Sequence, residues 1–476
     1  MPKIVLIEPK SPDLHIYSRF KLPRLGLLTL GAMMRDRGWE VDWIFEEIMR
    51  IDFPRIKEAD LVGISSITST APRAYMIADR VRQEGVPVIM GGPHVTFLAE
   101  EALQHADFVI RGEGEIPLMS FIDEWESGRD YAPVPGLSYW AEGHTRHNPQ
   151  GPALDDLDRL PFPDLSPLLA AGKGILGHRT IPIQTSRGCP FDCAFCSVTG
   201  MFGKRYRFRS TRSVIEELRR YDHRKNHIFF YDDNFAANPR RLKTLLQAMR
   251  DEKFSFTWST QVRIDISQDE ELVRLMRETG CRTLYIGLES VNARSLESMR
   301  KRQTPAQMEE ALRVFRRQRI PIHGMFVYGF DEDDWGTVKK TVRFAKRARL
   351  SSTQFLILTP LPGSEFYRKV LSEKRLLFKD WGLFDAHHVV FRPKQISLAA
   401  LQKAQIVSHK RFYSWMQCLK KALRFRWFEV AIARYARGLN RMWRRKNRTF
   451  IKVIKLLTGQ QQAGISVDFH QNIELD

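Results

Sequence analysis

The chain has little cysteine, no long apolar run and no internal repeat. Its 476 residues include five cysteines, and the first 188 residues contain none. An odd number of cysteines, and so few of them, argues against a disulfide framework and is typical of a protein in a reducing compartment. No apolar run approaches the roughly 18 residues of a transmembrane helix, and the N-terminal apolar run lacks a signal-peptide cleavage site. These absences predict a cytoplasmic protein.

Acidic residues are scarce in one region. The formal net charge is +20, and residues 401–457 contain 16 Lys and Arg but a single acidic residue, Glu429. Between residues 399 and 457 the basic residues alternate with aromatic and aliphatic ones. This pattern fits a membrane-surface anchor, a nucleic-acid patch or a solvated helical cap on the preceding domain. The interleaved Trp and Phe favour the membrane interface over nucleic acid.

Three cysteines lie in one short run, Cys189, Cys193 and Cys196, with the spacing Cys-x-x-x-Cys-x-x-Cys. Thiolates favour zinc or iron–sulfur clusters over harder metals. Zinc sites usually pair two hooks of Cys or His, whereas Cys281 and Cys418 are isolated in this sequence. Three protein ligands leave one iron of a cluster open to a small molecule. The run predicts such a cluster, with a zinc knuckle as the alternative.

Residues 1–130 alternate short apolar runs with amphipathic segments, which predicts a doubly wound parallel α/β sheet. The expected strands are Ile4–Ile7, Val41–Phe45, Leu61–Ile64, Val86–Met90 and Phe108–Ile110, with helices at Gly26–Arg37 and Arg73–Gln83. Loops containing Gly91, Gly92, Gly112 and Glu113 follow strands, where open α/β sheets place their ligands. Glycines there let the backbone approach a ligand closely.

A linker rich in proline and glycine is expected over residues 131–178. The strand–helix alternation resumes over residues 179–373, where about six βα units predict a partial (β/α)6 barrel with its motifs at the strand ends. A basic helical extension is expected over residues 374–458, followed by a disordered tail, 459–476.

With Phe195 directly before the last cysteine, the three-cysteine run resembles the signature of the radical S-adenosylmethionine enzymes. The resemblance implies that Cys189, Cys193 and Cys196 hold a 4Fe–4S cluster. Its open iron would bind the amino and carboxylate groups of S-adenosylmethionine, which is cleaved reductively to a 5′-deoxyadenosyl radical. Such a radical must be made beside its target and away from water.

Four N-terminal segments resemble, in order and spacing, the cobalamin-binding domain fused to one class of these enzymes. They are Leu22–Leu30, Val62–Ser65, Gly91–Thr96 and Arg111–Glu115. The Asp-x-His-x-x-Gly motif that ligates cobalt in many cobalamin proteins is incomplete, because Ser18 replaces its glycine after Asp13-Leu14-His15. We therefore expect bound cobalamin without a histidine ligand from His15 or His94, since a lone loop histidine is more often a hydrogen-bonding residue.

The resemblance also implies positions that contact S-adenosylmethionine. Asp232, Asp233 and Asn234 follow the second barrel strand and match residues at its methionine end, although a turn or helix cap is the alternative. Matches to residues that hold the ribose hydroxyls or the methionine carboxylate are Gln261, Arg263 and Glu289, with surface ion pairs as the alternative. The fifth-strand motif containing Gly324 and Phe326 is similar to the one against which adenine packs.

The main prediction is a cobalamin-dependent radical S-adenosylmethionine enzyme that methylates an unactivated carbon of a hydrophobic or lipid-like substrate. Trp381–Arg392 resembles a segment of a subgroup that includes hopanoid methylases. An external electron donor such as flavodoxin or ferredoxin and peripheral contact with the inner face of the membrane are expected, and nucleic acid is not. The alternatives are a radical cyclase of the same architecture, an RNA methylthiotransferase, which would need additional N-terminal cysteines, and a non-catalytic cluster protein.

Overall fold

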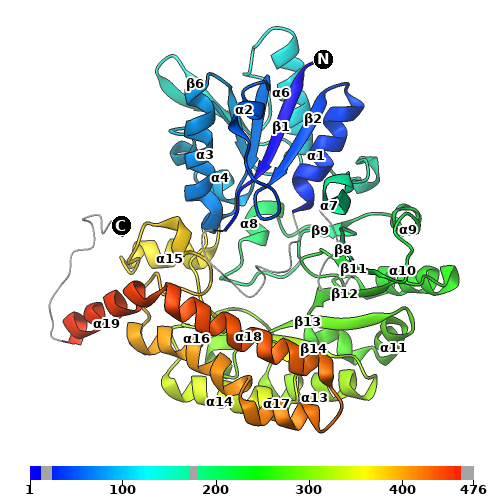
Figure 1. Cartoon of the computed structure of the whole chain (residues 1–476), viewed down its shortest axis with the longest axis vertical. Coiled ribbons are helices and arrows are strands. Elements are labelled where there is room, and N and C mark those ends of the chain that lie inside the picture. Colours follow the sequence, from blue (N-terminus) through cyan, green and yellow to red (C-terminus); the bar gives the residue numbers. More distant parts are fainter. Residues whose placement is uncertain (12–23, 171–178, 463–476) are drawn as a thin grey trace. The chain divides into compact units, whose positions relative to one another are not determined.

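The computed structural model describes residues 1–11, 24–170 and 179–462 (Figure 1). These residues divide into two compact units. The first contains residues 1–11, 24–170, 179–190 and 197–233, and the second contains residues 191–196 and 234–462.

A seven-stranded sheet forms the N-terminal part of the first unit, with strand order β2-β1-β3-β4-β5-β6-β7. Its parallel strands are β1 (Lys3–Glu8), β2 (Glu40–Phe45), β3 (Leu61–Ser65), β4 (Val88–Gly91) and β5 (Phe108–Ile110). The intervening helices are α1 (Leu25–Asp36), α2 (Phe53–Ile56), α3 (Ala71–Gln83), α4 (Pro93–Phe97), α5 (Ala99–Ala102) and α6 (Glu115–Glu126). Strand β1 is buried continuously from Ile4 to Ile7, as expected of a parallel sheet covered on both faces.

Two further strands extend this sheet beyond residue 130. Strand β6 (Leu137–Ala141) pairs antiparallel with β5, and β7 (His144–His147) pairs antiparallel with β6. Glu142 and Gly143 join them with φ values of 52° and 81°, the left-handed values that a two-residue hairpin turn needs. The linker expected at this place from proline and glycine content therefore contains a hairpin of the N-terminal sheet.

The rest of the first unit begins the second strand–helix series. Strands β8 (Arg179–Ile183) and β11 (Asn226–Phe230) are parallel, with Ile181 opposite Ile228. Between these strands lie β9 (Ser186–Arg187), α8 (Val198–Phe202), β10 (Arg207–Phe208) and α9 (Thr211–Arg219). Before them lies α7 (Ser166–Ala170).

The second unit continues the series with four parallel strands that pair in chain order. These are β12 (Thr257–Val262), β13 (Cys281–Glu289), β14 (Ile322–Tyr328) and β15 (Ser352–Ile357). The helices are α10 (Pro239–Glu252), α11 (Glu270–Glu278), α12 (Ala293–Ser298), α13 (Pro305–Arg317), α14 (Trp335–Arg347) and α15 (Glu365–Ser372). A side chain caps the N-terminus of each of these six helices and fixes where it begins. The capping residues are Asn238, Asp269, Asn292, Thr304, Asp334 and Ser364.

Four helices follow at the C-terminal end: α16 (Leu398–Phe412), α17 (Trp415–Ala422), α18 (Trp427–Lys446) and α19 (Arg448–Gln462). Helix α16 packs against β14 and β15. Directly after α16, the Tyr413 hydroxyl donates to the Thr353 carbonyl of β15 (2.7 Å) and accepts from the Thr353 N–H (2.8 Å). Helix α19 continues to Gln462, beyond the expected start of the disordered tail; residues 463–476 lie outside the described residues. Of the described helices, none is long and apolar enough to cross a membrane.

Candidate cluster and cofactor site

The predicted metal ligands lie on the loop between β9 and α8. Cys189, Cys193 and Cys196 are half-buried, and no disulfide joins any of the five cysteines. The Cys196 N–H donates to the Cys193 carbonyl (3.0 Å) and closes a tight turn. Cys281, in contrast, is fully buried in β13, and burial raises the pKa of its thiol above the usual range. Since the thiolate is the form that binds metal, the loop cysteines are the better donors.

Among the residues that the structure describes, no group of three or more His, Cys, Asp or Glu side chains is placed to hold a metal ion. A 4Fe–4S cluster makes a different demand, because each thiolate binds a different iron and the sulfurs need not converge on one atom. Three half-buried cysteines on one loop therefore fit a cluster better than a zinc knuckle.

The part of this loop in the second unit is held by residues that follow barrel strands. The Ala194 N–H donates to the Met299 carbonyl (3.2 Å), and the Ala194 carbonyl accepts from the Phe366 N–H (2.9 Å). Phe195 packs edge-on against Phe330, which follows β14, with 6.0 Å between ring centroids. The aromatic residue of the predicted signature therefore anchors the loop.

The part of the loop in the first unit is held by Asp232 and Asp233, directly after β11. The buried Asp232 carboxylate accepts hydrogen bonds from the Thr185 N–H (3.2 Å) and hydroxyl (3.0 Å) and from the Ser186 hydroxyl. Asp233 accepts from the N–H of Gly188, the residue before Cys189. Gly188 has a φ of 82°, and a Cβ there would lie 2.6 Å from the Arg205 carbonyl oxygen, so this position requires glycine.

Asp233 and Asn234 differ from Asp232 in having polar atoms that remain available. The Asp233 side chain is accessible to solvent, yet surrounding protein atoms and the Asp232 charge raise its pKa to about 7, against the opposing Gly188 hydrogen bond. Asn234 is buried, and its Oδ1 lacks a hydrogen-bond partner among the described residues. An unpaired buried acceptor of this kind costs about 1–3 kcal/mol, and a bound ammonium group would relieve that cost.

Two other predicted contacts are joined by Lys301. The Lys301 ammonium pairs with the Glu289 carboxylate at 2.7 Å, and both side chains are almost fully buried. The Lys301 carbonyl accepts a hydrogen bond from Arg263 (2.6 Å), and the Arg263 guanidinium lies 3.8 Å from the ring centroid of Phe191 in the cysteine loop. Sequence analysis missed Lys301, because no motif distinguishes it from the many surface lysines. Gln261 is half-buried at the end of β12, where its carbonyl accepts from the Phe235 N–H (3.1 Å).

The structure places Gly324 and Phe326 on the helix-covered face of β14. Phe326 is buried, stacked on Phe355 (5.6 Å between centroids) and edge-on to Phe344 of α14 (6.2 Å). A Cβ on Gly324 would lie 2.6 Å from the Leu350 side chain. Because side chains alternate along a strand, Met325 points to the opposite face and is half-buried. The residue of this motif on the face opposite the helices is therefore Met325, and not the predicted Gly324 or Phe326.

That same face carries polar residues that sequence analysis did not identify. His323 of β14 lies two residues before Met325, and its Nδ1 is 2.8 Å from the Ser352 hydroxyl. Its ring lies 4.9 Å from the ring of Tyr285 on the neighbouring strand. Burial lowers the pKa of His323 to about 4, so its imidazole is neutral at pH 7. The signal that could have found it is a histidine at an inward position of a predicted barrel strand.

The predicted cobalamin loops follow β4 and β5 in the first unit. Gly91 ends β4, and Gly92 has a φ of 100° with its Cβ position 2.5 Å from the Ser66 carbonyl oxygen, so only glycine fits there. The Gly112 N–H donates to the Thr96 hydroxyl (3.0 Å). Glu113 differs from the expected cofactor contact, because its carboxylate binds Arg187 (2.9 Å) and Arg207 in a nearly buried cluster.

The predicted absence of a histidine ligand to cobalt concerns two residues. His94 is fully buried at the start of α4, and its Nε2 lies 3.1 Å from the Tyr75 hydroxyl. His15 lies outside the described residues. The surroundings of His94 are those of a hydrogen-bonding core residue.

Family models match both predicted cofactor domains: the radical SAM superfamily over residues 183–345 and the B12 binding domain over residues 14–122. An uncharacterized methyltransferase of Pyrococcus horikoshii is 32% identical, with 88% of this chain and 94% of the relative covered. The bacteriochlorophyllide d C-12(1)-methyltransferase of Chlorobaculum tepidum is 28% identical (90% and 91% covered). The hopanoid C-3 methylase of Methylococcus capsulatus is 27% identical (87% and 81% covered).

Solved structures with the same fold include two enzymes with cobalamin bound. TsrM from Kitasatospora setae, a radical S-adenosylmethionine methyltransferase with cobalamin and a 4Fe–4S cluster bound, gives a TM-score of 0.65 at 18% identity over 78% of this chain and 75% of that chain. OxsB with aqua-cobalamin and S-adenosylmethionine bound gives 0.68 at 16% identity over 98% and 82%. These likenesses confirm the predicted fold class.

The chain therefore belongs to the radical S-adenosylmethionine enzymes that carry a B12-binding domain. Membership confirms the predicted enzyme class and its three cofactors: the 4Fe–4S cluster, S-adenosylmethionine and cobalamin. Methyl transfer is the activity named for all three curated relatives, and the substrates named for two of them are small molecules.

Proposed function

We propose that this enzyme methylates an unactivated carbon of a hydrophobic or lipid-like small molecule. The observation that carries the proposal is the combination, in one chain, of a three-cysteine loop anchored at barrel strand ends with a B12-binding domain. When bound, the cluster and S-adenosylmethionine supply a radical that abstracts hydrogen, and cobalamin supplies the methyl group.

The residues have distinct roles in this proposal. Cys189, Cys193 and Cys196 hold the cluster, and Asn234 accepts a hydrogen bond from the ammonium group of S-adenosylmethionine through its unpaired Oδ1. A bound ammonium group beside Asp233 would also favour the ionised carboxylate, whose pKa is otherwise raised to about 7.

Several predicted contacts are better described as positioning residues. Asp232 uses its carboxylate to hold Thr185 and Ser186, and Arg263 stacks on the cysteine loop. Lys301 pairs with the Glu289 carboxylate and orients it at the end of β13. For cobalamin, Gly91, Gly92 and Gly112 provide side-chain-free loops after β4 and β5, while Glu113 holds Arg187 two residues before Cys189.

We also propose a cytoplasmic location, an external one-electron donor such as flavodoxin or ferredoxin, and contact with the inner face of the membrane. The sparse cysteines and the half-buried cluster loop support a reducing compartment. The apolar and basic surface of α17 and α18 supports the membrane contact.

A second candidate is a radical cyclase. The anaerobic magnesium-protoporphyrin IX monomethyl ester cyclase of Rubrivivax gelatinosus is 26% identical over 79% of this chain and 71% of the relative. This similarity extends over most of the chain, so the same architecture is compatible with ring formation.

An anaerobic assay separates these functions. The reconstituted enzyme would be given S-adenosylmethionine labelled in its methyl group, cobalamin, a chemical reductant and an extract of membrane lipids. Methylation predicts both 5′-deoxyadenosine and a labelled product, whereas cyclisation predicts 5′-deoxyadenosine with no label in the product. No 5′-deoxyadenosine above the level of the Cys193→Ala control would contradict both.

A further inference from the structure

Large apolar side chains are exposed at high density where α17 meets α18. Residues 415–428, here named the α17–α18 corner, contain two exposed tryptophans and two exposed phenylalanines. Exposed fractions are 65% for Trp415, 82% for Phe425 and 63% for Trp427. Leu419, Leu423 and Phe428 are also exposed. Single exposed apolar residues are common, but a contiguous patch marks an interaction surface.

Helix α17 presents one face to solvent and another to the protein. Trp415, Leu419 and Leu423 recur every four residues, which places them on one face of the helix. On the protein side, Cys418 is buried, and Lys421 donates to the Ser351 carbonyl (2.6 Å). The Trp415 ring also lies 4.5 Å from the Arg437 guanidinium of α18, so the orientation of α17 is fixed by these contacts while Leu419 and Leu423 stay exposed.

The backbone conformation at position 425 does not favour the phenylalanine that occupies it. Its φ is 57°, a left-handed value that Gly or Asn adopts readily and that is unusual for a bulky residue. Its ring is the most exposed of the corner. Neither local conformation nor packing within the described chain favours phenylalanine here, so the side chain is available for a contact outside the molecule.

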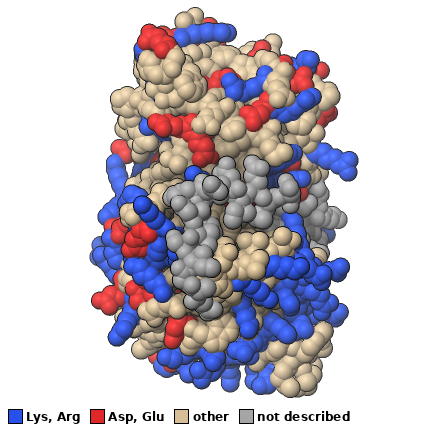
Figure 2. All heavy atoms as spheres, turned by 90° about the vertical axis from the view of Figure 1, so that its left-hand side faces the viewer, with Lys and Arg blue, Asp and Glu red and all other residues tan. Residues whose placement is uncertain are grey.

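The charge around the corner has one sign. Glu429 is the single acidic residue of α16–α19, and it is buried and paired with Lys421 (3.0 Å) and Arg426. Exposed cations within the corner include Lys420 and Arg424, and Arg434, Arg441, Arg444 and Arg445 are exposed further along α18. Figure 2 shows Lys and Arg side chains gathered around uncharged surface.

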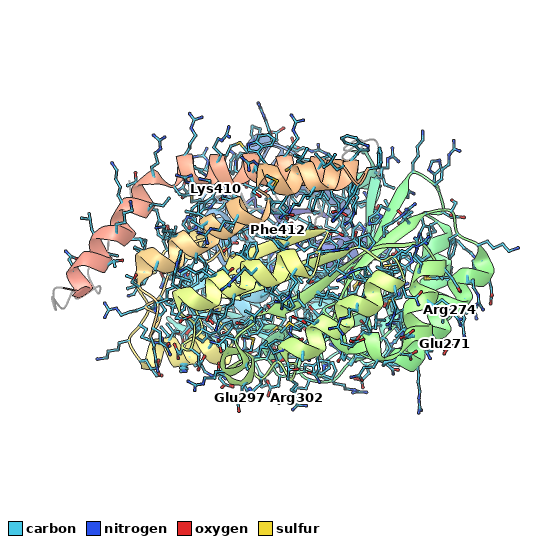
Figure 3. The ribbon with its side chains drawn as sticks, turned by 90° about the horizontal axis from the view of Figure 1, so that it is seen from below. Glu271, Arg274, Glu297, Arg302, Lys410 and Phe412 are labelled. Atoms are coloured by element: carbon cyan, nitrogen blue, oxygen red, sulfur yellow. The ribbon has the colours of Figure 1, made fainter. Side chains whose placement is uncertain are left out.

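Helix α16, which precedes the corner in the chain, is more buried than the helices that follow it. On α16, Phe412 is buried and Lys410 is exposed; both are labelled in Figure 3. In that view α18 and α19 lie along the upper edge, with long side chains projecting outward. Helix α16 is thus part of the core, and the outward surface belongs to the helices that follow it.

We propose that the α17–α18 corner docks the enzyme on an anionic lipid bilayer. Aromatic and aliphatic side chains flanked by Lys and Arg match the interface of such a bilayer, where rings insert at headgroup level and cations meet anionic headgroups. A symmetric dimer through the same patch would place two cationic surfaces face to face. Exposed Leu419 and Leu423 have no use in nucleic-acid binding, which relies on stacking and phosphate contacts.

This inference makes the membrane contact of the proposed function specific to one surface. It does not depend on methyl transfer, because the corner lies outside the cysteine loop and cofactor residues. Its test is a binding measurement and stays informative if no methylated product is found.

The experiment is co-sedimentation of the full-length protein with vesicles of phosphatidylcholine alone or mixed with phosphatidylglycerol. We expect binding to the mixed vesicles that weakens with salt but does not vanish. The variant Leu423→Ser/Phe425→Asn/Trp427→Ser should bind at least tenfold more weakly, with an unchanged melting temperature because these side chains are exposed. The matched control Met76→Ser/Trp140→Ser/Leu371→Ser removes apolar side chains exposed elsewhere and should bind like the wild type.

Charge is tested by Lys420→Gln/Arg424→Gln, which removes two exposed cations of the corner and should reduce binding to the mixed vesicles and lessen its salt dependence. Equal sedimentation of the corner variant and the matched control would overturn the proposal. So would binding of the wild type to neutral vesicles as strong as to anionic ones. If the corner variant instead abolishes a dimer seen by sedimentation velocity without vesicles, the surface is a self-association interface and the proposal is wrong.

Discussion

At the scale of single residues, the cysteine spacing could be interpreted from the sequence, whereas the partners of the polar residues could not. Arg263 and Glu289 were identified at strand ends, but each depends on Lys301, which lies after the following helix. Partners that far apart in the chain are brought together by the fold, and a single sequence carries no signal of it. Asp232 likewise matches a cofactor position, yet its carboxylate is used within the protein.

We predict that Cys189→Ala, Cys193→Ala and Cys196→Ala each abolish the 4Fe–4S cluster, because each removes one of its three thiolates. Cys281→Ala and Cys418→Ala should retain it, since both residues are buried in the core. Iron and sulfide quantification after anaerobic reconstitution is the measurement. A full complement of iron and sulfide in the Cys193 variant would contradict the assignment of the ligands.

The buried His323 predicts loss of stability in acid. Its pKa is lowered from the usual 6.5 to about 4 by burial. Above pH 6.5 the ring is neutral in both states; below it, the unfolded chain binds a proton that the folded chain does not accept until about pH 4. The free energy of unfolding should therefore fall by about 1.4 kcal/mol per pH unit over this window. Burial also lowers the pKa of His409 to about 4, and this shift reduces stability in acid in the same way.

Urea unfolding of the reconstituted enzyme between pH 7.5 and 5 measures this effect. The variant His323→Gln removes one titrating group, so its midpoint should depend less steeply on pH than that of the wild type. Comparing slopes, rather than midpoints, separates the proton effect from any packing change. Identical slopes would mean that His323 takes up its proton over the same pH range in the folded protein as in the unfolded chain, and would contradict the lowered pKa.

At the scale of helices and strands, segments with a regular apolar periodicity could be predicted from the sequence, whereas irregular segments could not. The expected strand at Phe108–Ile110 has the bounds found in the structure, and the expected helix at Arg73–Gln83 ends where α3 ends. The hairpin at residues 137–147 was missed because its composition is that of a linker, and because Glu142 takes a left-handed φ that the sequence does not signal. Helix α16 was grouped with a surface tail because its basic residues obscured the buried positions Leu401, Ala404 and Phe412.

We predict that Tyr413→Phe destabilises the second unit by about 1–3 kcal/mol. The hydroxyl bonds both the N–H and the carbonyl of Thr353 in β15, and its removal leaves buried backbone groups unpaired. Thermal or urea unfolding followed by circular dichroism is the measurement. Leu419→Ala serves as a control on the neighbouring helix, because the Leu419 side chain is exposed. Helix α16 and Tyr413 contact β15, so removing residues from Leu401 onward would expose that strand. The membrane surface is therefore tested by point substitutions and not by truncation.

At the scale of the whole molecule, the chain combines two cofactor domains whose cofactors the family membership confirms, while the details of cobalt ligation stay a prediction. The incomplete Asp-x-His-x-x-Gly motif predicts that no histidine of this chain ligates cobalt. The environment of His94 supports this, since its Nε2 is directed to the Tyr75 hydroxyl and its ring is fully buried. A buried, hydrogen-bonded imidazole would have to leave its partner and rearrange the start of α4 to reach a metal.

We therefore expect the cobalt(II) form of the full-length enzyme to show an electron paramagnetic resonance spectrum without splitting from an axial nitrogen. The variants His94→Ala and His15→Ala should leave that spectrum unchanged, and both should be measured at equal cobalamin occupancy. Loss of cobalamin from the His94 variant alone would reflect the cavity left in the core, so occupancy is determined from the absorption spectrum first. Nitrogen splitting in the wild type that disappears in either variant would identify that histidine as the ligand and show that the incomplete motif is misleading.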